Sequence, residues 1–483
     1  MDKPHQASRS FLFLLSSQLF SKIAGYLFFL LAARYLGVEN FGIYTYALAV
    51  VTIFSVFIDY GFSTFSIREI AKDREKAHLF LSNTILLRTG MAVLAYGLIL
   101  ILTLLLERKP IKHEVLLVLN LYLFVRVFAE SFDSLFFAFE KQAYKALLVV
   151  FNNLVILSFG YFLLKRGGGI LTLSWVYVGG AALTGALSIF LVSNKIVKPR
   201  FSFSLEKCKW IVKRSTGFAL PILVASLNVR VCILILSSLK GDLLVGLYNA
   251  ASRLIDGLNF VPATLGFIIY PMFSRTHSTE SGAFQRIMNR ASKFILGLSL
   301  PIVIGVSILS RPIVATFYGQ EYSSSALALS ILACGLIPIS LNYIFGHALF
   351  SSNLQRHSLQ VSVIGLSLTI IGNMLLIGSY GLVGACIVTI GVDSFITLGY
   401  FYFLRKNGLE PKHLTWLRSL VFPAVLMAAL VFFLKDRLFW IENLLIGTLA
   451  YVLISVISGA ISKSEIREML EIFGIKRSIQ ETT

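Results

Sequence analysis

Long apolar runs separated by short polar segments recur along the whole chain. Each run holds about 18 to 29 residues, enough for a membrane-crossing helix, because about 20 helical residues span the hydrocarbon of a bilayer. The segments between the runs are too short for a soluble domain. The pattern predicts an all-α integral membrane protein with about fourteen transmembrane helices, near residues 11–33, 42–66, 81–106, 115–138, 143–164, 170–193, 216–239, 243–271, 293–316, 324–350, 358–377, 382–403, 417–434 and 441–461.

The composition agrees with this interpretation. Of the 483 residues, 57% are apolar and 14% are charged, whereas soluble proteins carry about 25% charged residues. The net charge of +19 could suggest a nucleic-acid partner, but the distribution of charge gives another explanation. With the N-terminus inside, about 28 of the Lys and Arg residues fall in inner segments and about 10 in outer loops. This bias places both ends in the cytoplasm and predicts membrane lipids, and no nucleic acid, as partners.

The sequence predicts no metal site and no cofactor. Its four cysteines, at positions 208, 232, 334 and 386, show no CxxC spacing. His347 is the only histidine well inside a predicted span, and no Cys, Asp or Glu lies at metal-ligand spacing from it. The chain also has no GxxxxGK[ST] phosphate loop, so we expect no ATP hydrolysis by the chain itself.

A short motif occurs twice, offset by 204 residues. Gly37-Val-Glu-Asn-Phe-Gly42-Ile-Tyr44 lies between the first two spans, and Gly241-Asp-Leu-Leu-Val-Gly246-Leu-Tyr248 between the seventh and eighth. Both connect an outward-running span to an inward-running one, which indicates two parallel halves, a layout common in transporters. We expect two six-helix lobes, 1–205 and 206–405, divided at a basic inner connection, and a third segment, 406–483, with the last two helices and a cytoplasmic tail.

Ten ionisable residues fall well inside the predicted spans. A charged side chain at the bilayer centre costs about 2.5 to 3.5 kcal/mol on insertion scales, so these residues must face the interior of the bundle or a wet cavity. They are Lys22, Asp59, Arg88, Arg126, Glu130, Asp133, Arg230, Arg253, Asp256 and Asp393.

Four cations among these residues lie nearer the middle or the outer half of their helices. Lys22, Arg126, Arg230 and Arg253 are therefore candidates for an anion site. Phosphate and pyrophosphate suit arginine, because its planar donors match their oxygens bidentately. The alternative is structural pairing within one helix, since Glu130 follows Arg126 by four residues and an aspartate follows Arg253 by three.

The remaining charges are candidates for gating or ion coupling, with structural pairing as the alternative. Asp59, Glu130 and Asp133 lie toward the cytoplasmic ends of their helices, where Arg88 can close them as a gate or as a lock between the lobes. Asp256 and Asp393 lie near the central cations instead.

Several short motifs resemble the Wzx-type polysaccharide and O-antigen flippases of the multidrug/oligosaccharidyl-lipid/polysaccharide (MOP) exporter superfamily. The resemblance covers nearly the whole chain, although each motif is short. The motifs are Ser21-Lys22-x2-Gly25, Arg34-Tyr-Leu-Gly37-x4-Gly42-x-Tyr44, Gly241-x4-Gly246-x-Tyr248-x2-Ala251-x-Arg253, Gly319-x-Glu321-Tyr322, and Asn373 with Tyr380-Gly381-Leu382-Val383-Gly384-Ala385.

This resemblance implies two six-helix lobes around a cationic cavity, with the last two spans forming a groove for a polyprenyl tail. The implied cargo is an undecaprenyl-pyrophosphate-linked oligosaccharide, an O-antigen or capsular or exopolysaccharide repeat unit. Alternating access coupled to an ion gradient would move it across the cytoplasmic membrane. The implied partners also include the polysaccharide polymerase and chain-length machinery. The four candidate cations would then meet the pyrophosphate or acidic sugars.

Two other functions remain open from the sequence. One is a small-molecule or drug exporter of the same superfamily. The other is an enzyme, a membrane glycan polymerase or ligase, which would need an essential residue in an outer loop. The short outer loops offer few candidates beyond Arg108, Lys112 and Glu321, and we therefore expect a transporter and not an enzyme.

Overall fold

The computed structural model describes residues 3–107, 109–197, 202–276, 281–409 and 415–460. These ranges contain α-helices, two short 3-10 helices and no strand. By packing, the chain divides into two compact units, Met1–Gly246 and Leu247–Thr483.

Eleven helical segments of the described residues are long and apolar enough to cross a membrane. Two of these, Ser16–Lys72 and Gln355–Lys406, are long enough for two crossings each. A glycine with non-helical backbone angles breaks each of them, Gly37 in the first and Gly381 in the second. With the shorter apolar helix Ser419–Leu434, the helices correspond to the predicted spans. The prediction of an all-α, multi-pass membrane protein is confirmed.

The first unit is built from eight helices, one 3-10 helix and the start of a ninth helix. They are α1 (Lys3–Asp59), α2 (Phe62–Lys72), η1 (Arg74–Lys76), α3 (Ala77–Leu106), α4 (Pro110–Glu130), α5 (Asp133–Ala138), α6 (Gln142–Lys165), α7 (Ile170–Lys195), α8 (Leu205–Lys240) and α9 (Asp242–Leu258).

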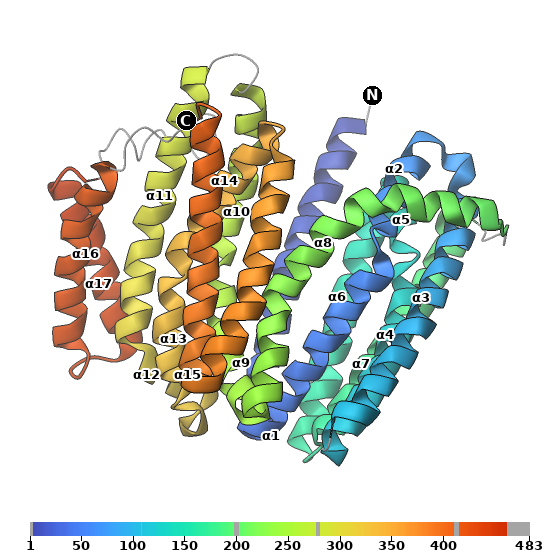
Figure 1. The fold of residues 1–483 in the computed structure, drawn as a ribbon, viewed down its shortest axis with the longest axis horizontal. Helices are drawn as coiled ribbons and strands as arrows, with labels where there is room; N and C mark the ends of the chain where they lie inside the picture. Colours follow the sequence, from blue (N-terminus) through green and yellow to red (C-terminus); the bar gives the residue numbers. More distant parts are fainter. Residues whose placement is uncertain (1–2, 108, 198–201, 277–280, 410–414, 461–483) are drawn as a thin grey trace. The chain divides into compact units, whose positions relative to one another are not determined.

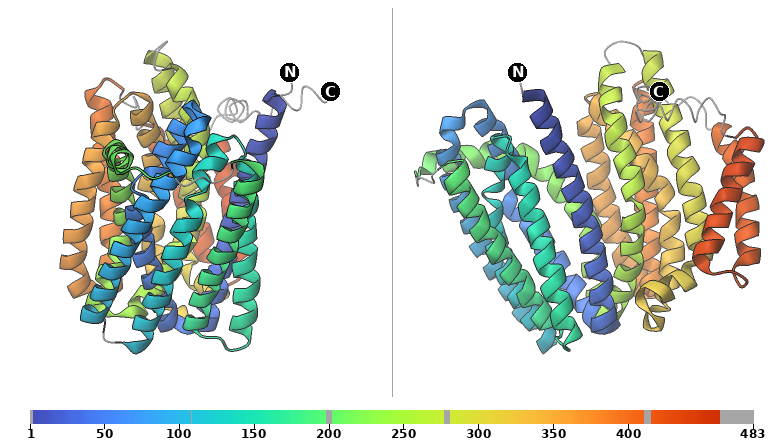
Figure 2. Two further views of the ribbon diagram at one scale, coloured as in Figure 1. Left: turned by 90° about the vertical axis from the view of Figure 1, so that its right-hand side faces the viewer. Right: turned by 180° about the vertical axis from the view of Figure 1, so that it is seen from behind.

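Within this unit α1 packs on α6 and α8, and α4 packs on α3 and α7 (Figures 1 and 2). Small residues allow the close approach of α4 and α7: a Cβ added at Gly185 would lie 3.2 Å from the Cβ of Ala129. At one end of the unit, Phe62, Phe65 and Phe136 are part of a buried cluster under α2 and α5.

From Leu205 onward, the basic connection between the predicted lobes is helical and forms the first turns of α8. Residues 198–201 of that connection lie outside the described ranges. Trp210 packs against the rings of Phe65 and Phe80, with centroids 5.3 and 6.1 Å apart, and α8 bends beyond this segment (Figure 1). Pro221 lies inside α8, where its missing N–H and its ring permit such a bend.

The second unit contains the rest of α9 and the remaining helices. They are α10 (Phe260–Thr276), α11 (Ser281–Ile308), α12 (Ser310–Tyr318), η2 (Gln320–Tyr322), α13 (Ser325–Cys334), α14 (Leu336–Ser351), α15 (Gln355–Lys406), α16 (Thr415–Leu434) and α17 (Trp440–Ile457).

In this unit a buried cluster joins α10, α11, α14 and α15, with Phe273, Phe284 and Ile344 among its members. The last two helices pack on each other and on α11. Asn443, fully buried on α17, donates from Nδ2 to the carbonyl O of Val431 on α16 at 3.0 Å. These contacts make α16 and α17 a packed pair, and a groove for a lipid tail beside them stays a prediction.

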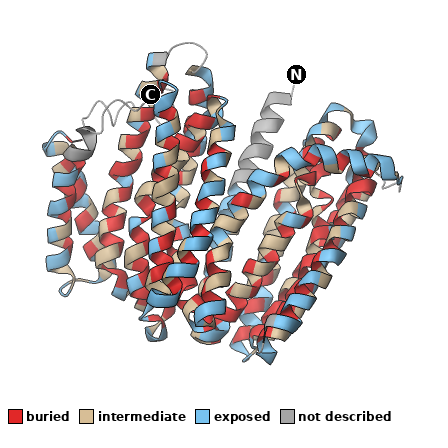
Figure 3. Ribbon diagram, in the orientation of Figure 1, coloured by how far each residue is buried: buried red, intermediate tan, exposed pale blue. Residues whose placement is uncertain are grey.

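Large apolar side chains cover the outward faces of many helices. On α3, Leu94 is 74% exposed and Leu105 is 76% exposed, and exposed residues run along the same helix in Figure 3. A soluble protein rarely exposes contiguous apolar surface of this kind. Hydrocarbon-facing helices require it, since no polar group there can be satisfied by water.

The two copies of the repeated motif share backbone geometry. Gly37 has φ 73° and ψ 170°, and Gly241 has φ 84° and ψ 175°, a conformation open to glycine because it has no Cβ. A Cβ added at Gly42 would overlap the carbonyl O of Asp242, and one at Gly246 would overlap the carbonyl O of Val38. Val38 and Asp242 occupy the same position in the two motifs, so the contact is reciprocal.

The tyrosines that end the motifs make corresponding bonds. Tyr44 donates from its hydroxyl to the hydroxyl of Tyr177 on α7 at 2.5 Å, and the hydroxyl of Tyr248 lies 3.0 Å from Oγ1 of Thr389 on α15. Each tyrosine thus reaches the last helix of its predicted half, which supports the duplication. The compact units meet in the chain at Gly246, so α8 packs with the first unit, whereas the predicted lobe boundary at residues 205 and 206 stays a prediction.

Candidate functional site

The first unit contains a partly open cavity of about 440 Å³. It lies among α1, α4, α5, α6 and α7, the helices from which its lining residues come. Ten of its 18 lining residues carry polar or charged groups: Tyr122, Arg126, Glu130, Asp133, Lys145, Asn152, Asn153, Tyr177, Thr184 and Ser188. A polar cavity of this size inside an apolar bundle holds water or a polar ligand.

The charges of the cavity form two ion pairs. Nε of Arg126 donates to Oε1 of Glu130 at 2.7 Å, one turn further along α4. Lys145, near the start of α6, pairs with Asp133 at the start of α5. Two carboxylates thus balance two cations, which offsets the cost of holding four charges at this depth.

An aromatic wall and a row of amides complete the lining. The ring of Tyr177 meets that of Tyr122 edge to face, with centroids 5.4 Å apart, and lies 6.2 Å from the ring of Phe28. On α6, Oδ1 of Asn152 accepts a hydrogen bond from Thr184 at 3.2 Å, and Nδ2 of Asn153 donates to Ser21 on α1 at 2.7 Å. Aromatic faces beside hydrogen-bonding groups suit a ligand with both apolar and polar surface.

Ser188, also on the lining, has an unused hydrogen-bonding group. Its residue is 2% exposed, and its Oγ has no hydrogen-bond partner among the described residues. Buried hydroxyls are normally paired, because an unpaired one loses its hydrogen bonds to water without replacement. The oxygen itself is closed to solvent, so a ligand reaches this hydroxyl only when the neighbouring side chains shift.

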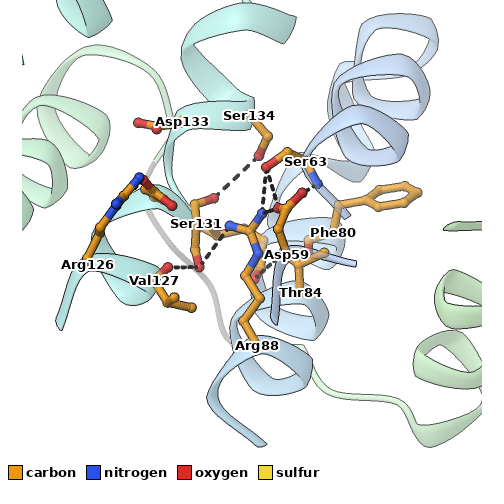
Figure 4. Close-up of polar contacts among 12 residues, drawn as sticks. Asp59, Ser63, Phe80, Thr84, Arg88, Arg126, Val127, Ser131, Asp133 and Ser134 are labelled. Carbon is orange, nitrogen blue, oxygen red and sulfur yellow. Dashed lines mark hydrogen bonds and ion pairs between the residues drawn. The ribbon is translucent and has the colours of Figure 1, made fainter. Parts of the chain in front are cut away.

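A second polar cluster lies in the same unit, around Arg88 of α3 (Figure 4). Arg88, which is 4% exposed, forms an ion pair with Asp59 at the end of α1. Its guanidinium also donates to Ser63 of α2 at 2.6 Å and to Ser131, just after α4, at 3.3 Å. One arginine therefore ties together four segments of the chain.

A third cluster surrounds Lys112 in the first turn of α4. Its Nζ lies 2.9 Å from Oδ1 of Asp242, 3.1 Å from Oε1 of Glu107 and 2.8 Å from Oγ of Ser237. It also sits over the ring of Tyr46, 3.7 Å from the centroid. The cluster joins α1, α4 and α8 to the start of α9, beside the repeated motif.

This placement of Lys112 differs from the expectation that it lies in an outer loop. Pro110 at the first position starts α4 five residues before the predicted span, since proline has no N–H to lose there. Lys112 is consequently buried in a structural ion cluster and offers no surface for an enzyme site. Of the other two outer-loop candidates, Glu321 is exposed in η2, and Arg108 lies outside the described ranges.

Of the four predicted anion-binding cations, the cavity lining includes Arg126 and does not include Lys22 or Arg230 among the described residues. Lys22 is exposed on α1, and Arg230 is half-buried on α8. Arg253 belongs to the second unit. Its Nη1 lies 3.6 Å from Oδ2 of Asp256, which is the local pair that the spacing of the two residues predicts. A shared anion site for the four stays a prediction.

The gating candidates divide between the units. Asp59, Arg88, Glu130 and Asp133 all belong to the first unit, where they form the pairs described above, and a lock between lobes stays a prediction. Asp393 lies half-buried in α15. Its carbonyl O accepts hydrogen bonds from Asn342 at 3.3 Å and Thr397 at 2.9 Å.

Sequence reasoning missed several residues of the cavity. Lys145 was absent from the predicted set because it lies near the start of its span. The neutral residues, Asn152, Thr184 and Ser188, carry no charge that would single them out. The available signal was their spacing on α6 and α7, where polar residues recur toward one face.

Comparisons with known proteins agree with this architecture. A family described as "Polysaccharide biosynthesis protein" matches residues 7–277, more than half of the chain. A protein of Escherichia coli K12 that carries the name O-antigen transporter is 22% identical over 400 residues, which cover 78% of this chain and 91% of the relative. A protein of Haloferax volcanii named as the low-salt glycan biosynthesis flippase Agl15 is 22% identical over 364 residues, covering 74% and 75% of the two chains.

Solved structures show the same fold. The lipid II flippase MurJ in an inward closed conformation superposes with a TM-score of 0.76 at 18% identity, covering 92% of this chain and 98% of its own. An inward-facing multidrug resistance MATE family transporter of the MOP superfamily gives a TM-score of 0.66 at 16% identity, covering 82% and 97%. The family match and the named relatives confirm the predicted resemblance to polysaccharide flippases, and the solved structures confirm the fold.

Proposed function

Because the chain belongs to the polysaccharide biosynthesis protein family, we propose that it is a flippase that moves a lipid-linked oligosaccharide across a membrane. The observation that carries this proposal is the partly open cavity of about 440 Å³ in the first unit, which charged and hydrogen-bonding side chains help to line. A membrane protein that only packs helices gains nothing from such a cavity, whereas one that carries sugars needs a wet, polar surface within the membrane. Relatives named as O-antigen transporter and flippase support the same function.

The cargo in this proposal is an undecaprenyl-pyrophosphate-linked repeat unit of an O-antigen, capsule or exopolysaccharide. It moves from the inner to the outer face of the cytoplasmic membrane by alternating access between two lobes, with both chain ends in the cytoplasm. The polysaccharide polymerase and chain-length machinery would receive the product. The protein acts as a transporter and not as an enzyme, since it breaks no covalent bond of the cargo.

Different residues are candidates for binding the cargo, for gating and for ion coupling. Of the four predicted cations, Lys22, Arg230 and Arg253 are the candidates for the pyrophosphate, because a fixed or mobile cation at membrane depth offsets its negative charge. The fourth, Arg126, lines the cavity, where Glu130 holds it. The ion pair of Asp59 and Arg88 is the candidate gate, since it ties four segments that must shift when the unit rocks. Asp393, like Asp256, is a candidate for coupling to an ion gradient.

The test uses two alanines that are neighbours on α7. Ala181 lines the cavity and is 5% exposed, whereas Ala182 is exposed. In a host deleted for the gene, we expect Ala181→Phe to fill the cavity and to abolish glycan on intact cells, measured by lectin or antibody labelling. Lipid-linked glycan should accumulate in the membrane. The Ala182→Phe variant, at equal membrane level, should restore surface glycan as the wild-type chain does.

Two outcomes would contradict the proposal. If deletion leaves surface glycan and the lipid-linked pool unchanged, the chain does not carry this cargo. If deletion shortens the polymer while single repeat units still reach the surface, the activity is that of a polymerase.

A further inference from the structure

The charges of the cavity leave no net attraction for an ion. Arg126 and Lys145 each hold a carboxylate, Glu130 and Asp133 respectively. An anionic ligand would have to displace a carboxylate from a cation, and a cationic ligand would have to displace the cation. Separating a partly buried pair costs more than the new contact returns unless the ligand reproduces its geometry. The cavity therefore favours a ligand without charge.

The hydrogen-bonding groups of the cavity that remain available suit a ligand with hydroxyl groups. Oγ of Ser188 has no partner among the described residues, and the hydrogen bond of Asn152 uses Oδ1, which leaves Nδ2 for a ligand. The first group donates and accepts, and the second donates only. A sugar hydroxyl can serve both, because it donates one hydrogen bond and accepts two. Both groups come from α6 and α7, and they line the same cavity.

The aromatic wall suits the apolar face of a sugar ring. Phe28, Tyr122 and Tyr177 contact one another as one group of rings, and the faces of such rings carry partial negative charge. The C–H groups of a pyranose are weakly positive and pack on such faces. The volume of about 440 Å³ falls within the range of about 300 to 1,000 Å³ that small-molecule pockets occupy.

We propose that this cavity binds an uncharged sugar residue of the glycan, while the charged groups of the cargo bind elsewhere. The proposal rests on the proposed function for the identity of the cargo, and on the paired charges, the unpaired Ser188 hydroxyl and the aromatic wall for the class of sugar.

The test measures binding of simple probes to the purified full-length chain in nanodiscs. The probes are the methyl glycosides of glucose, galactose and N-acetylglucosamine, with methyl glucuronide as the acidic counterpart, and saturation-transfer NMR reports binding. We expect at least one neutral glycoside to bind at least tenfold more tightly than the glucuronide. Ala181→Phe should abolish this binding, and Ala182→Phe should retain it.

A second variant avoids any effect on packing. Ser188→Ala removes a hydroxyl that has no partner within the protein, so the fold loses no hydrogen bond. We expect neutral glycosides to bind about threefold to tenfold more weakly to it, the effect of one lost hydrogen bond. An unchanged affinity would mean that the hydroxyl bonds only to water.

Breaking one ion pair should reverse the preference. Glu130→Gln leaves Arg126 without its carboxylate, and we expect the glucuronide to gain at least tenfold relative to the neutral glycosides. Glu140→Gln is the matched control, since Glu140 is an exposed carboxylate paired with Arg74 at the surface.

The outcomes separate this proposal from the proposed function. If the glucuronide binds the wild-type chain more tightly, or if no probe binds, the cavity is not a neutral-sugar site, even where deletion still blocks surface glycan. If a neutral glycoside binds in the cavity but deletion leaves the glycan unchanged, the binding site stands and the flippase function fails.

Discussion

The first unit has two charged clusters, one around Lys112 and one in the cavity. They contain the same types of residue but differ in how far these residues are buried. The side chains of Lys112 and Asp242 are 5% and 3% exposed. The oxygens and the tyrosine ring described above surround the ammonium group of Lys112. The side chains of Arg126 and Glu130 are 37% and 36% exposed, because they border the cavity. A closed cluster fixes the positions of helices, whereas an open one leaves its groups accessible to a ligand.

The difference shows that the presence of a charge inside a membrane span is a weak indicator of function. Both clusters carry the desolvation cost that makes such charges rare. What distinguishes the cavity is that its charged side chains border open space, whereas those around Lys112 are closed off. Exposure therefore separates binding residues from structural ones better than charge does.

The largest expected effect comes from opening the closed cluster. Lys112→Met leaves Glu107 and Asp242 buried without their shared cation, and we expect a loss of about 3 to 5 kcal/mol in unfolding free energy. The matched change in the cavity, Lys145→Met, should cost less, about 1 to 3 kcal/mol, because the side chain of Asp133 is 18% exposed and that of Asp242 is 3% exposed. Thermal unfolding of the purified variants, followed by size-exclusion chromatography, measures both.

The double variant of Lys112→Met with Asp242→Asn controls for this interpretation. It removes one of the two carboxylates that lose Lys112, so it should unfold at a higher temperature than Lys112→Met alone. Equal losses for Lys112→Met and Lys145→Met would show that the two clusters do not differ in the way their exposure indicates.

The next effect tests the repeated motif beside the closed cluster. Gly42→Ala places a Cβ where the carbonyl O of Asp242 lies, and backbone cannot move aside as a flexible side chain can. We expect a loss of about 3 kcal/mol, at the upper end of ordinary overpacking costs.

Gly97→Ala on α3 is the matched control, since nothing lies within 4 Å of a Cβ there. That variant should gain about 0.5 to 1 kcal/mol, because alanine loses less backbone freedom in a helix than glycine. A Gly42→Ala protein as stable as the Gly97→Ala protein would contradict the reciprocal contact between the two motifs.

Sequence alone predicted the features that depend on neighbours along the chain. The spans follow from apolar runs, and the pairs of Arg126 with Glu130 and of Arg253 with Asp256 follow from helical spacing. The repeated motif predicted a connection between two spans at each copy, and the helix breaks there at Gly37 and Gly241, in a conformation that glycine adopts freely.

Pairs between helices were harder to predict. The partner of Asp133 is Lys145 on another helix, and the partner of Lys112 is Asp242, far along the chain. Such pairs depend on the rotation and depth of each helix, which periodicity fixes only within a turn or so. The neutral donors of the cavity, such as Asn152, were not predicted for a further reason. Whether such a group can bind a ligand depends on which of its atoms already have partners, and this requires the three-dimensional structure.

The smallest expected effect lies at the rim of the closed cluster, at Lys109. Its Nζ is 2.5 Å from Oε1 of Glu39 and 3.2 Å from Oδ2 of Asp242. The hydrogen bond to the Glu39 carboxylate raises the pKa of Lys109 above its ordinary value of 10.5. Because the charged form is favoured in the folded state, its stabilisation is fully present below about pH 10.5 and is lost as pH rises through the higher, folded-state pKa.

The side chain of Lys109 is 46% exposed, so solvent screening limits this stabilisation to less than about 1 kcal/mol. We expect wild type to melt about 1 °C or less above Lys109→Gln at pH 9, and the difference to vanish toward pH 11.5. Lys109→Arg, which stays charged at that pH, should keep its advantage over Lys109→Gln. A difference between wild type and Lys109→Gln that persists unchanged at pH 11.5 would assign the effect to packing of the lysine stem, and the rim of the cluster would then hold by contact and not by charge.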